Sequence, residues 1–360
     1  MDAPLRILLT ADPLLPVPPT GYGGIERIVA AIAESCRQRG HHVALAALAG
    51  SQASVERFFP WPHAPGLGAW DALRNALSLR RAVRAFRPNV VHSFSRLAYL
   101  TPLFREGTPL IMSYQRHTGG RQITWASRAA GRRLSFTGCS EFICRMGRRA
   151  GGDWTAIPNF VDPARFTFVP AVPARAPLVF LSRVESIKGA HLAIAIAQQS
   201  RRALIIAGNR ATSGPEADYW RDHIVPHLGR DGIDYIGEVG DAKKNDLLGR
   251  AAALLVPIQW DEPFGIVFVE ALAAGTPVIT CGREAVPEII EDGRTGLMIR
   301  NVDDGVAAVA RIPSLDRAAC RQAVEAKFSV ERCVDAYLGL YRRAMARARG
   351  DAASGHDSPR

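Results

Sequence analysis

The stretch that decides the fold reads Asp261-Glu262-Pro263-Phe264-Gly265-Ile266-Val267-Phe268-Val269-Glu270. It is a polar loop that runs into a helix, which we expect over residues Phe264–Ala274. Apolar runs lie on either side of it, Ala253–Pro257 before and Pro277–Thr280 after. A strand, a helix and another strand in this order are typical of a parallel sheet that is covered by helices.

The same alternation occurs twice along the chain. In the first half, the expected strands and helices are Arg6–Thr10, Ile25–Arg39, Val43–Ala47, Trp70–Phe86, Asn89–His92 and Pro109–Ser113. In the second half, they are Leu178–Ser182, Gly189–Gln199, Ala203–Ala207, Ile233–Ile236, Ala242–Arg250, Ala253–Pro257, Phe264–Ala274, Pro277–Thr280 and Gly296–Ile299. Two restarts of one pattern predict an α/β protein with two doubly wound, Rossmann-like domains.

The domain boundaries follow from the composition of the connecting segments. Val169–Pro177 holds three prolines in nine residues and is the expected linker. It separates an N-terminal domain, 1–168, from a C-terminal domain, 178–328. A final amphipathic helix over 329–348 is expected to cross back to the first domain, and the polar tail 349–360 is expected to be disordered.

The bulk composition is that of a globular protein. Of the 360 residues, 48% are hydrophobic and 22% charged. No run approaches the roughly 18 apolar residues of a membrane span, and the N-terminus lacks the basic start of a signal peptide. The six cysteines have neither zinc-finger nor Cys-x-x-Cys spacing, so we interpret them as reduced, buried thiols. These features predict a cytoplasmic protein.

The net charge of +11 is confined to one half of the chain. Residues 1–170 hold 21 arginines, no lysine and 10 acidic residues, whereas the remainder holds 24 basic and 24 acidic residues. One interpretation is solubility combined with a codon bias for arginine. The other is attraction to an anionic partner, either a membrane surface or an acidic glycan. Nucleic acid is disfavoured, because no aromatic residues are interleaved with the basic ones in the manner of single-strand binders.

Glu262 and Glu270 are the first candidate site residues. One precedes the predicted helix and the other lies two turns inside it, and carboxylates accept hydrogen bonds from the hydroxyls of a polyol. Between them, the backbone N–H groups of Gly265, Ile266 and Val267 form a helix N-terminus that suits a diphosphate. The alternative is that both glutamates only complement the helix dipole.

Arg183 and Lys188 are the second candidates, in Leu181-Ser182-Arg183-Val184-Glu185-Ser186-Ile187-Lys188-Gly189. Two cations at the carboxyl end of a strand neutralise a leaving diphosphate without a metal, although an exposed basic loop would look the same. Gly23 and Gly24 follow the first strand and allow close approach of the backbone to phosphate. They lack the Gly-x-Gly-x-x-Gly pattern of dinucleotide binding, which disfavours nicotinamide and flavin enzymes.

The sequence contains no Asp-x-Asp and no His, Cys or Asp cluster with metal-ligand spacing. We therefore expect no cofactor and no divalent metal. Two histidines follow strands of the first domain. His92 is the better candidate for a structural residue, and His117, beside Thr118-Gly119-Gly120, is a candidate for catalysis.

Taken together, these motifs resemble the family 4 retaining glycosyltransferases of the GT-B fold, in which two Rossmann-like domains face an interdomain cleft. The likeness covers nearly the whole chain and is most specific from Glu262 onward. The motifs that carry it are Gly23-Gly24-Ile25-Glu26, Ile157–Asp162, Ser182-Arg183, Lys188-Gly189, Ala207-Gly208, Asp261–Glu270, Ala274–Ile279, Glu288 and Asp292–Gly296.

The resemblance implies a role for each matching residue. Arg183, Lys188, Gly23 and Gly24 would hold the donor diphosphate, and Glu270 would hold the nucleoside ribose. His117 would lie near the transferred sugar as a catalytic residue, together with Glu262, Arg183 and Lys188. The remaining donor-binding positions would be Gly208, Gly237, Glu238, Val239, Glu262, Phe264, Gly265, Ile266 and Val267.

The implied activity is transfer of a hexose from a nucleotide diphosphate sugar, with retention of anomeric configuration and without a metal. The acceptor would be a glycan or a lipid-linked molecule, as in polysaccharide or lipopolysaccharide biosynthesis. The arginine-rich first domain would dock peripherally on the anionic inner face of the cytoplasmic membrane. Two alternatives share the fold: a sugar-nucleotide 2-epimerase and a non-catalytic nucleotide-sugar-binding protein.

Overall fold

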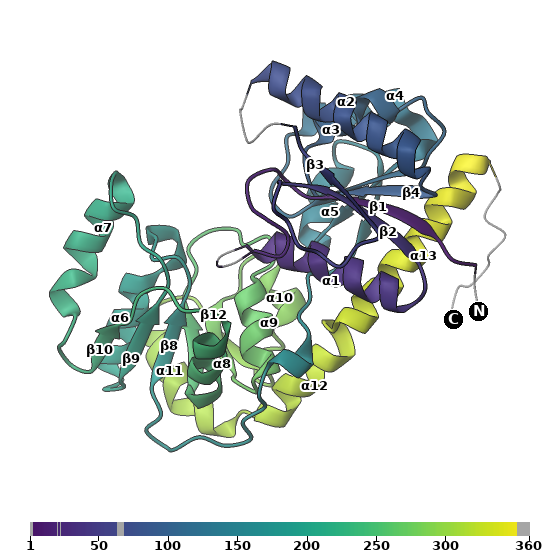
Figure 1. The fold of residues 1–360 in the computed structure, drawn as a ribbon. Helices are drawn as coiled ribbons and strands as arrows, with labels where there is room; N and C mark the ends of the chain where they lie inside the picture. Colours follow the sequence, from purple (N-terminus) through teal and green to yellow (C-terminus); the bar gives the residue numbers. More distant parts are fainter. Residues whose placement is uncertain (1–2, 20, 22, 63–67, 351–360) are drawn as a thin grey trace. The chain divides into compact units, whose positions relative to one another are not determined.

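The computed structural model of the chain describes residues 3–19, 21, 23–62 and 68–350. It separates into two compact units, the first made of Met1–Asn159 with Val330–Arg360 and the second of Phe160–Ser329. Each unit contains one parallel sheet with helices on both faces (Figure 1). The predicted fold class, two parallel-sheet α/β domains, is confirmed.

The first sheet has seven parallel strands in the order β3-β2-β1-β4-β5-β6-β7. Its strands are β1 (Arg6–Thr10), β2 (His42–Ala47), β3 (Arg57–Pro60), β4 (Val90–Ser93), β5 (Leu110–Tyr114), β6 (Leu134–Gly138) and β7 (Asp153–Ala156). Its helices are α1 (Gly24–Gln38), α2 (Ala69–Phe86), α3 (Leu97–Leu100), α4 (Gly120–Ala130), α5 (Glu141–Arg148) and α13 (Val330–Arg349). The winding direction reverses at β1, where Leu8 lies opposite Ala44 of β2 and Val91 of β4.

The second sheet repeats this topology with six parallel strands in the order β10-β9-β8-β11-β12-β13. Its strands are β8 (Leu178–Leu181), β9 (Leu204–Ala207), β10 (Ile233–Tyr235), β11 (Ala253–Val256), β12 (Val278–Cys281) and β13 (Gly296–Ile299). Its helices are α6 (Ala190–Gln199), α7 (Pro215–His223), α8 (Asp241–Arg250), α9 (Ile266–Ala273), α10 (Val286–Ile289), α11 (Val302–Arg311) and α12 (Arg317–Lys327). Ligands of such sheets bind where the winding reverses, here beyond the carboxyl ends of β8 and β11.

The final helix, α13, packs on the first unit although it follows the second in sequence. The hydroxyl of Tyr341 lies 2.7 Å from Nδ1 of His92, and Nε2 of His92 lies 2.7 Å from the hydroxyl of Ser113. His92 is fully buried, and burial lowers its pKa to about 3. The imidazole is therefore neutral, with both ring nitrogens occupied, and His92 has the structural role that we expected for it.

The boundary between the units differs from the expected linker. Residues 169–177 belong to the second unit, because the N–H of Val169 donates to the carbonyl of Ala274 and its carbonyl accepts from Nε of Arg317. Prolines rule out a helix in this segment, but its backbone is still bound to neighbouring elements. The chain instead passes between the units after Asn159 and after Ser329. Of the expected tail, residues 351–360 lie outside the described residues.

Candidate functional site

The loops that follow β8 and β11 bring a lysine and a glutamate together at the point where the second sheet reverses. Nζ of Lys188 lies 2.5 Å from Oε2 of Glu262, and each side chain is only 11% exposed. Lys188 ends a short 3₁₀ turn before α6, and Glu262 precedes α9 by four residues. Two candidates that the sequence places 74 positions apart thus form one buried ion pair.

Trp260 completes this pair and was not among the expected site residues. Its indole N–H donates to Oε2 of Glu262 at 2.9 Å, and Nζ of Lys188 lies 4.7 Å from the centre of its ring. The ammonium is attracted to the negative ring face, while the carboxylate accepts hydrogen bonds from both neighbours. The lysine head is therefore fixed from two sides, with one of its three N–H donors directed to Glu262.

Arg183 lies in the same loop as Lys188, and its guanidinium forms an ion pair with Glu185. The side chain of Arg183 is 39% exposed, so it is partly accessible from solvent. Glu216 of α7 binds this loop through Ser186. One carboxylate oxygen of Glu216 accepts from the backbone N–H of Ser186 and the other accepts from its hydroxyl, each at 2.7 Å. Glu216 was not singled out from the sequence, because nothing local connects it to this loop.

Glu270, the expected ribose ligand, forms an ion pair with Lys244 of α8. Both side chains are largely buried, and Lys244 also lies 3.5 Å from Asp241. Each of the two glutamates in the 261–270 stretch therefore has a lysine partner. The carboxylates were expected from the sequence, whereas Lys244 and the pairing of Lys188 with Glu262 were not.

The start of α9 differs slightly from the prediction. The helix begins at Ile266, after Gly265 with a positive φ of 92°. The N–H groups of Ile266 and Val267 lie in its first turn, where a helix offers no acceptor of its own. The side chain of Phe264 is buried and packs against Phe328, 6.0 Å between ring centres, so Phe264 could offer only its backbone to a ligand.

The loops after β9 and β10 pack closely on the loop after β8. The N–H of Gly208 donates to the carbonyl of Gly237 at 2.9 Å, and the hydroxyl of Tyr235 donates to the carbonyl of Gly208 at 2.8 Å. A Cβ at Gly208 would lie 1.9 Å from the carbonyl oxygen of Ser182, so only glycine fits there. Glu238 is exposed and Val239 half-buried in the segment that follows.

In the first unit, the remaining candidates lie at the carboxyl ends of the strands. Gly23 precedes α1 with a φ of 150°, and Gly24 begins that helix. Glu26, in the first turn of α1, is buried, and burial raises the pKa of its carboxyl group. His117 is exposed in the loop between β5 and α4, with its ring 5.3 Å from that of Phe142.

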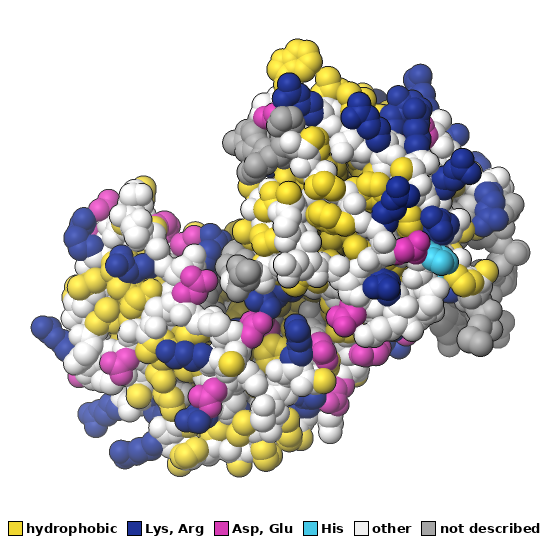
Figure 2. Space-filling view, in the orientation of Figure 1, with side chains coloured by type: hydrophobic (Ala, Val, Ile, Leu, Met, Phe, Trp, Pro, Cys, Tyr) yellow, Lys and Arg dark blue, Asp and Glu magenta, His cyan; other side chains and the backbone are white. Residues whose placement is uncertain are grey.

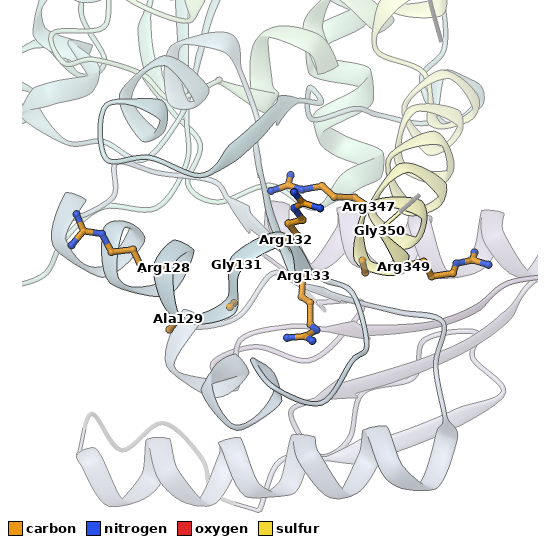
Figure 3. A pocket seen from close by; sticks show the side chains of 10 residues that line it. Arg128, Ala129, Gly131, Arg132, Arg133, Arg347, Arg349 and Gly350 are labelled. Carbon is orange, nitrogen blue, oxygen red and sulfur yellow. The ribbon is translucent and has the colours of Figure 1, made fainter. Parts of the chain in front are cut away.

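A pocket of about 390 Å³ lies where the ends of α4 and α13 meet (Figure 3). Its charged lining residues are Arg128, Arg132, Arg133, Arg347 and Arg349. In Figure 3 the guanidinium groups of Arg128, Arg133 and Arg349 point in different directions. Arg347 forms an ion pair with Asp153.

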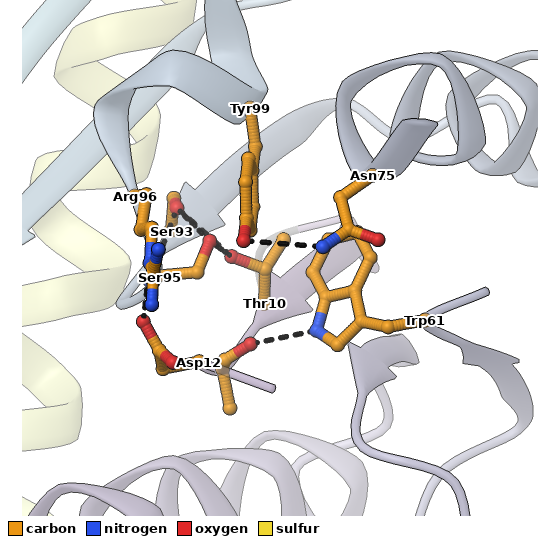
Figure 4. A network of polar contacts seen from close by, with 9 residues as sticks. Thr10, Asp12, Trp61, Asn75, Ser93, Ser95, Arg96 and Tyr99 are labelled. Carbon is orange, nitrogen blue, oxygen red and sulfur yellow. Dashed lines mark hydrogen bonds and ion pairs between the residues drawn. The ribbon is translucent and has the colours of Figure 1, made fainter. Parts of the chain in front are cut away.

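A polar network occupies the reversal point of the first sheet (Figure 4). The hydroxyls of Thr10, Ser93 and Ser95 lie 2.8 to 3.0 Å from one another. Beside them, Nε of Arg96 donates to Oδ2 of Asp12 at 3.2 Å, while Oδ1 of Asp12 is buried with no partner. This network, which lies at the carboxyl ends of β1 and β4 and in the loops that follow them, was not expected from the sequence.

Among the residues that the structure describes, no group of three or more His, Cys, Asp or Glu side chains is placed to hold a metal ion. Within the same ranges, no helix has both the length and the apolar character to cross a bilayer.

Comparisons with known proteins agree with this arrangement. The family model "Glycosyl transferases group 1" matches residues 171–325, and the model "Glycosyltransferase Family 4" matches residues 22–165. Together the two models span every strand of the two sheets except β1. The chain belongs to the family 4, group 1 glycosyltransferases.

Individual glycosyltransferases support the assignment. A glycogen synthase of Mycobacterium tuberculosis (strain CDC 1551 / Oshkosh) is 30% identical over 271 residues, which is 68% of this chain and 64% of that protein. The crystal structure of AviGT4, a glycosyltransferase involved in avilamycin A biosynthesis, superposes with a TM-score of 0.69 at 26% identity, covering 95% of this chain and 98% of that one. Alr3699/HepE of Anabaena, solved in complex with UDP and glucose, shares the fold, with a TM-score of 0.72, 17% identity, and coverage of 94% and 99%.

Proposed function

We propose that this chain is a retaining, metal-independent glycosyltransferase that moves a hexose from a nucleotide diphosphate sugar to a glycan or lipid-linked acceptor. The observation that carries the proposal is the Lys188–Glu262 pair at the reversal point of the second sheet, beside the first turn of α9. A lysine fixed to the loop that leads into a helix N-terminus is suited to a diphosphate. The complex of the Anabaena protein with UDP and glucose supports a nucleotide-sugar donor.

The chemistry assigned to the site is stabilisation of the leaving group. When the bond between the sugar and the diphosphate breaks, negative charge develops on the diphosphate. Lys188 and Arg183 are the cations that would balance it, and the N–H groups of Ile266 and Val267 would donate hydrogen bonds to its oxygens. A cation about 4 Å from such a charge contributes on the order of 4 kcal/mol at an effective dielectric constant near 20. Two cations thus replace what a divalent metal would supply.

Glu262 has two functions in this proposal. It holds Lys188 at a fixed place, and its other oxygen is directed to sugar hydroxyls. Glu270 remains the proposed ribose ligand, and its pairing with Lys244 fixes its carboxylate on α9. Gly237, Glu238 and Val239 are the proposed contacts to the base, and Gly208 remains a proposed donor-binding position. Gly23, Gly24 and His117 of the first unit remain the proposed contacts to the diphosphate and the transferred sugar.

The proposed acceptor side includes an anionic partner. The first unit carries its excess arginine on α2 and on the pocket between α4 and α13. We infer a peripheral association with an anionic membrane surface, where a lipid-linked acceptor would be met.

A thermal-shift screen tests the donor. UDP, GDP, ADP and their common sugar conjugates are added in the presence of EDTA, with the Arg183→Ala variant as control. A ligand that binds only the folded protein raises the melting temperature by mass action. We expect a shift with one nucleotide family that EDTA does not change and that Arg183→Ala loses. No shift with any nucleotide would refute the proposed donor site, and an epimerised sugar nucleotide formed without acceptor, detected by ¹H NMR, would identify an epimerase instead.

A further inference from the structure

One face of α2 exposes large apolar side chains to solvent. Trp70 is 77% exposed, Leu73 is 44% exposed and Leu77 is 39% exposed. Their spacing of three and four residues places them on one side of the helix. The opposite side is buried against the first unit and consists of Asn75, Ala76, Leu79, Ala82, Val83 and Phe86. An exposed stripe of this kind is a candidate interaction surface, because monomeric proteins rarely expose large contiguous apolar patches.

Arginines continue the same face toward the end of the helix. At about 100° per residue, Arg74, Arg81 and Arg84 fall within roughly a 120° arc that includes Trp70 and the two leucines. All three arginines are exposed, and Arg84 shares Glu106 with Arg80. Figure 2 shows hydrophobic and basic side chains next to each other over the region of α2. We call this set of six residues, Trp70, Leu73, Arg74, Leu77, Arg81 and Arg84, the apolar-basic face.

The helix that carries this face is firmly attached to the unit. Nδ2 of Asn75 donates to the hydroxyl of Tyr99 at 3.1 Å in a buried hydrogen bond, and Phe86 is buried at the other end. The apolar-basic face is therefore presented by a helix that is already formed. Binding through it would not require the entropy cost of folding a disordered segment.

The chemistry of the face distinguishes between possible occupants. A second copy of this chain, docked through the same patch, would place two sets of arginines in or beside one interface, and the patch offers no acidic residue to pair with them. An acidic glycan would pair with the arginines and would stack on the tryptophan, but it would leave the two leucines in water. A bilayer with anionic lipids satisfies both, since it offers phosphates at the level of the arginines and an apolar layer beneath them.

We propose that α2 is an interfacial membrane helix, in which Trp70, Leu73 and Leu77 insert at the headgroup boundary of an anionic bilayer while Arg74, Arg81 and Arg84 contact lipid phosphates. The proposal rests on the membrane partner of the proposed function and names the residues that bind it. Insertion of the three apolar side chains adds a hydrophobic contribution to the membrane affinity that the arginines alone would provide. Binding is therefore expected to persist in part when salt screens the charges.

Co-sedimentation of the full chain with vesicles tests the proposal. One set of vesicles is phosphatidylcholine alone, and the other contains 30 mol% phosphatidylglycerol. The test variant is Trp70→Ser/Leu73→Gln/Leu77→Gln, and the control is Val225→Gln, which removes from the second unit an apolar residue whose exposure (45%) is close to that of Leu73. We expect wild type and control to bind the anionic vesicles and the triple variant to bind at least tenfold more weakly. The variant Arg74→Gln/Arg81→Gln is expected to reduce binding and its salt dependence.

Fluorescence gives an independent measurement of depth. Lipids brominated on the acyl chain are expected to quench wild-type tryptophan emission more than that of Trp70→Phe. A triple variant that binds within twofold of wild type, or identical quenching in Trp70→Phe, would overturn the proposal. So would a wild-type dimer in light scattering that the triple variant abolishes, since the face would then be a protein interface. Nucleotide binding is measured separately, in solution without vesicles. It shows whether the proposed donor site is intact, so a failure of the membrane proposal is distinguished from a failure of the donor site.

Discussion

Lys188 and Glu262 form a buried ion pair in which Nζ lies 2.5 Å from Oε2, and the pair joins the loop after β8 to the loop after β11. Removing one partner leaves a charge buried without compensation. We therefore expect Lys188→Met to lower the free energy of unfolding by about 3 kcal/mol, partly offset by the N–H of Trp260. The double variant Lys188→Met/Glu262→Gln should recover at least half of this loss, as measured by urea unfolding.

An ion pair on the surface provides the control for these variants. Lys327 pairs with Glu291, and the two side chains are 54% and 31% exposed. Lys327→Met should change the stability by no more than about 0.5 kcal/mol. If the double variant at 188 and 262 is as unstable as the sum of the single variants, the two side chains are not coupled and the geometry is refuted.

Glu216 is expected to act as a positioning residue for the cationic loop. Its carboxylate accepts from the N–H and the hydroxyl of Ser186, between Arg183 and Lys188. Glu216→Ala releases that loop, so nucleotide affinity should fall about tenfold, which corresponds to about 1.4 kcal/mol. Glu216→Gln, which keeps an acceptor, should restore part of it. Asp218→Asn on the same helix is the control, and Glu216→Ala binding within twofold of wild type would contradict the role.

Substituting two glycines of the expected donor site by alanine distinguishes the stability lost to a steric clash from the stability lost to an unfavourable backbone conformation. Gly208→Ala should destabilise the protein by about 3 kcal/mol or more, because its Cβ would overlap the carbonyl of Ser182 and its φ is 138°. Gly237→Ala has a φ of 76° but no heavy atom within 4 Å of the new Cβ. It should cost only about 1–2 kcal/mol. Equal melting temperatures for the two variants would show that the loops after β8 and β9 are not in close contact.

His92 makes the stability of the protein depend on pH in a defined direction. Its pKa is about 3 in the folded protein against an ordinary value of 6.5. Between these values only the unfolded chain takes up the proton. The contribution of neutral His92 to the stability of the folded protein is therefore complete above about pH 6.5 and is lost as the pH falls toward 3. The slope near pH 5 is at most about 1.4 kcal/mol per pH unit. NMR should show an imidazole that stays neutral from pH 8 to 4.5, and a midpoint near 6.5 would contradict the buried contact with Tyr341.

Much of the fold follows from short-range patterns in the sequence. β8 and β11 are continuous apolar runs bounded by polar loops, so they were predicted nearly to the residue. β3 was not predicted, because Arg57–Pro60 is an edge strand with exposed ends and no buried apolar run. β6 was missed because its buried residues include Ser135 and Thr137, which do not mark a strand by hydrophobicity.

The candidate site also has a part that local motifs indicate and a part that depends on long-range contacts. Glu262, Lys188 and the start of α9 lie in local motifs, so the sequence alone indicated them. The partners of the site residues do not lie in such motifs. Glu216 lies 30 residues from Ser186, and Lys244 lies 26 residues from Glu270, so no local pattern links either pair. The predicted linker is misplaced because the proline content of 169–177 indicates only that a helix cannot continue there. It does not indicate which neighbouring groups the backbone of the segment binds.

The central claim, that cations of this chain and not a metal stabilise the departing diphosphate, is tested most directly by turnover in EDTA. The measurement is the rate of nucleotide release from the sugar nucleotide that gives the thermal shift, for wild type and for Arg183→Ala. We expect a wild-type rate that EDTA leaves unchanged. Arg183→Ala should be slower by a factor of about 30 to 1,000, equivalent to about 2–4 kcal/mol of barrier. Loss of wild-type turnover in EDTA, or an Arg183→Ala rate within threefold of wild type, would contradict the account.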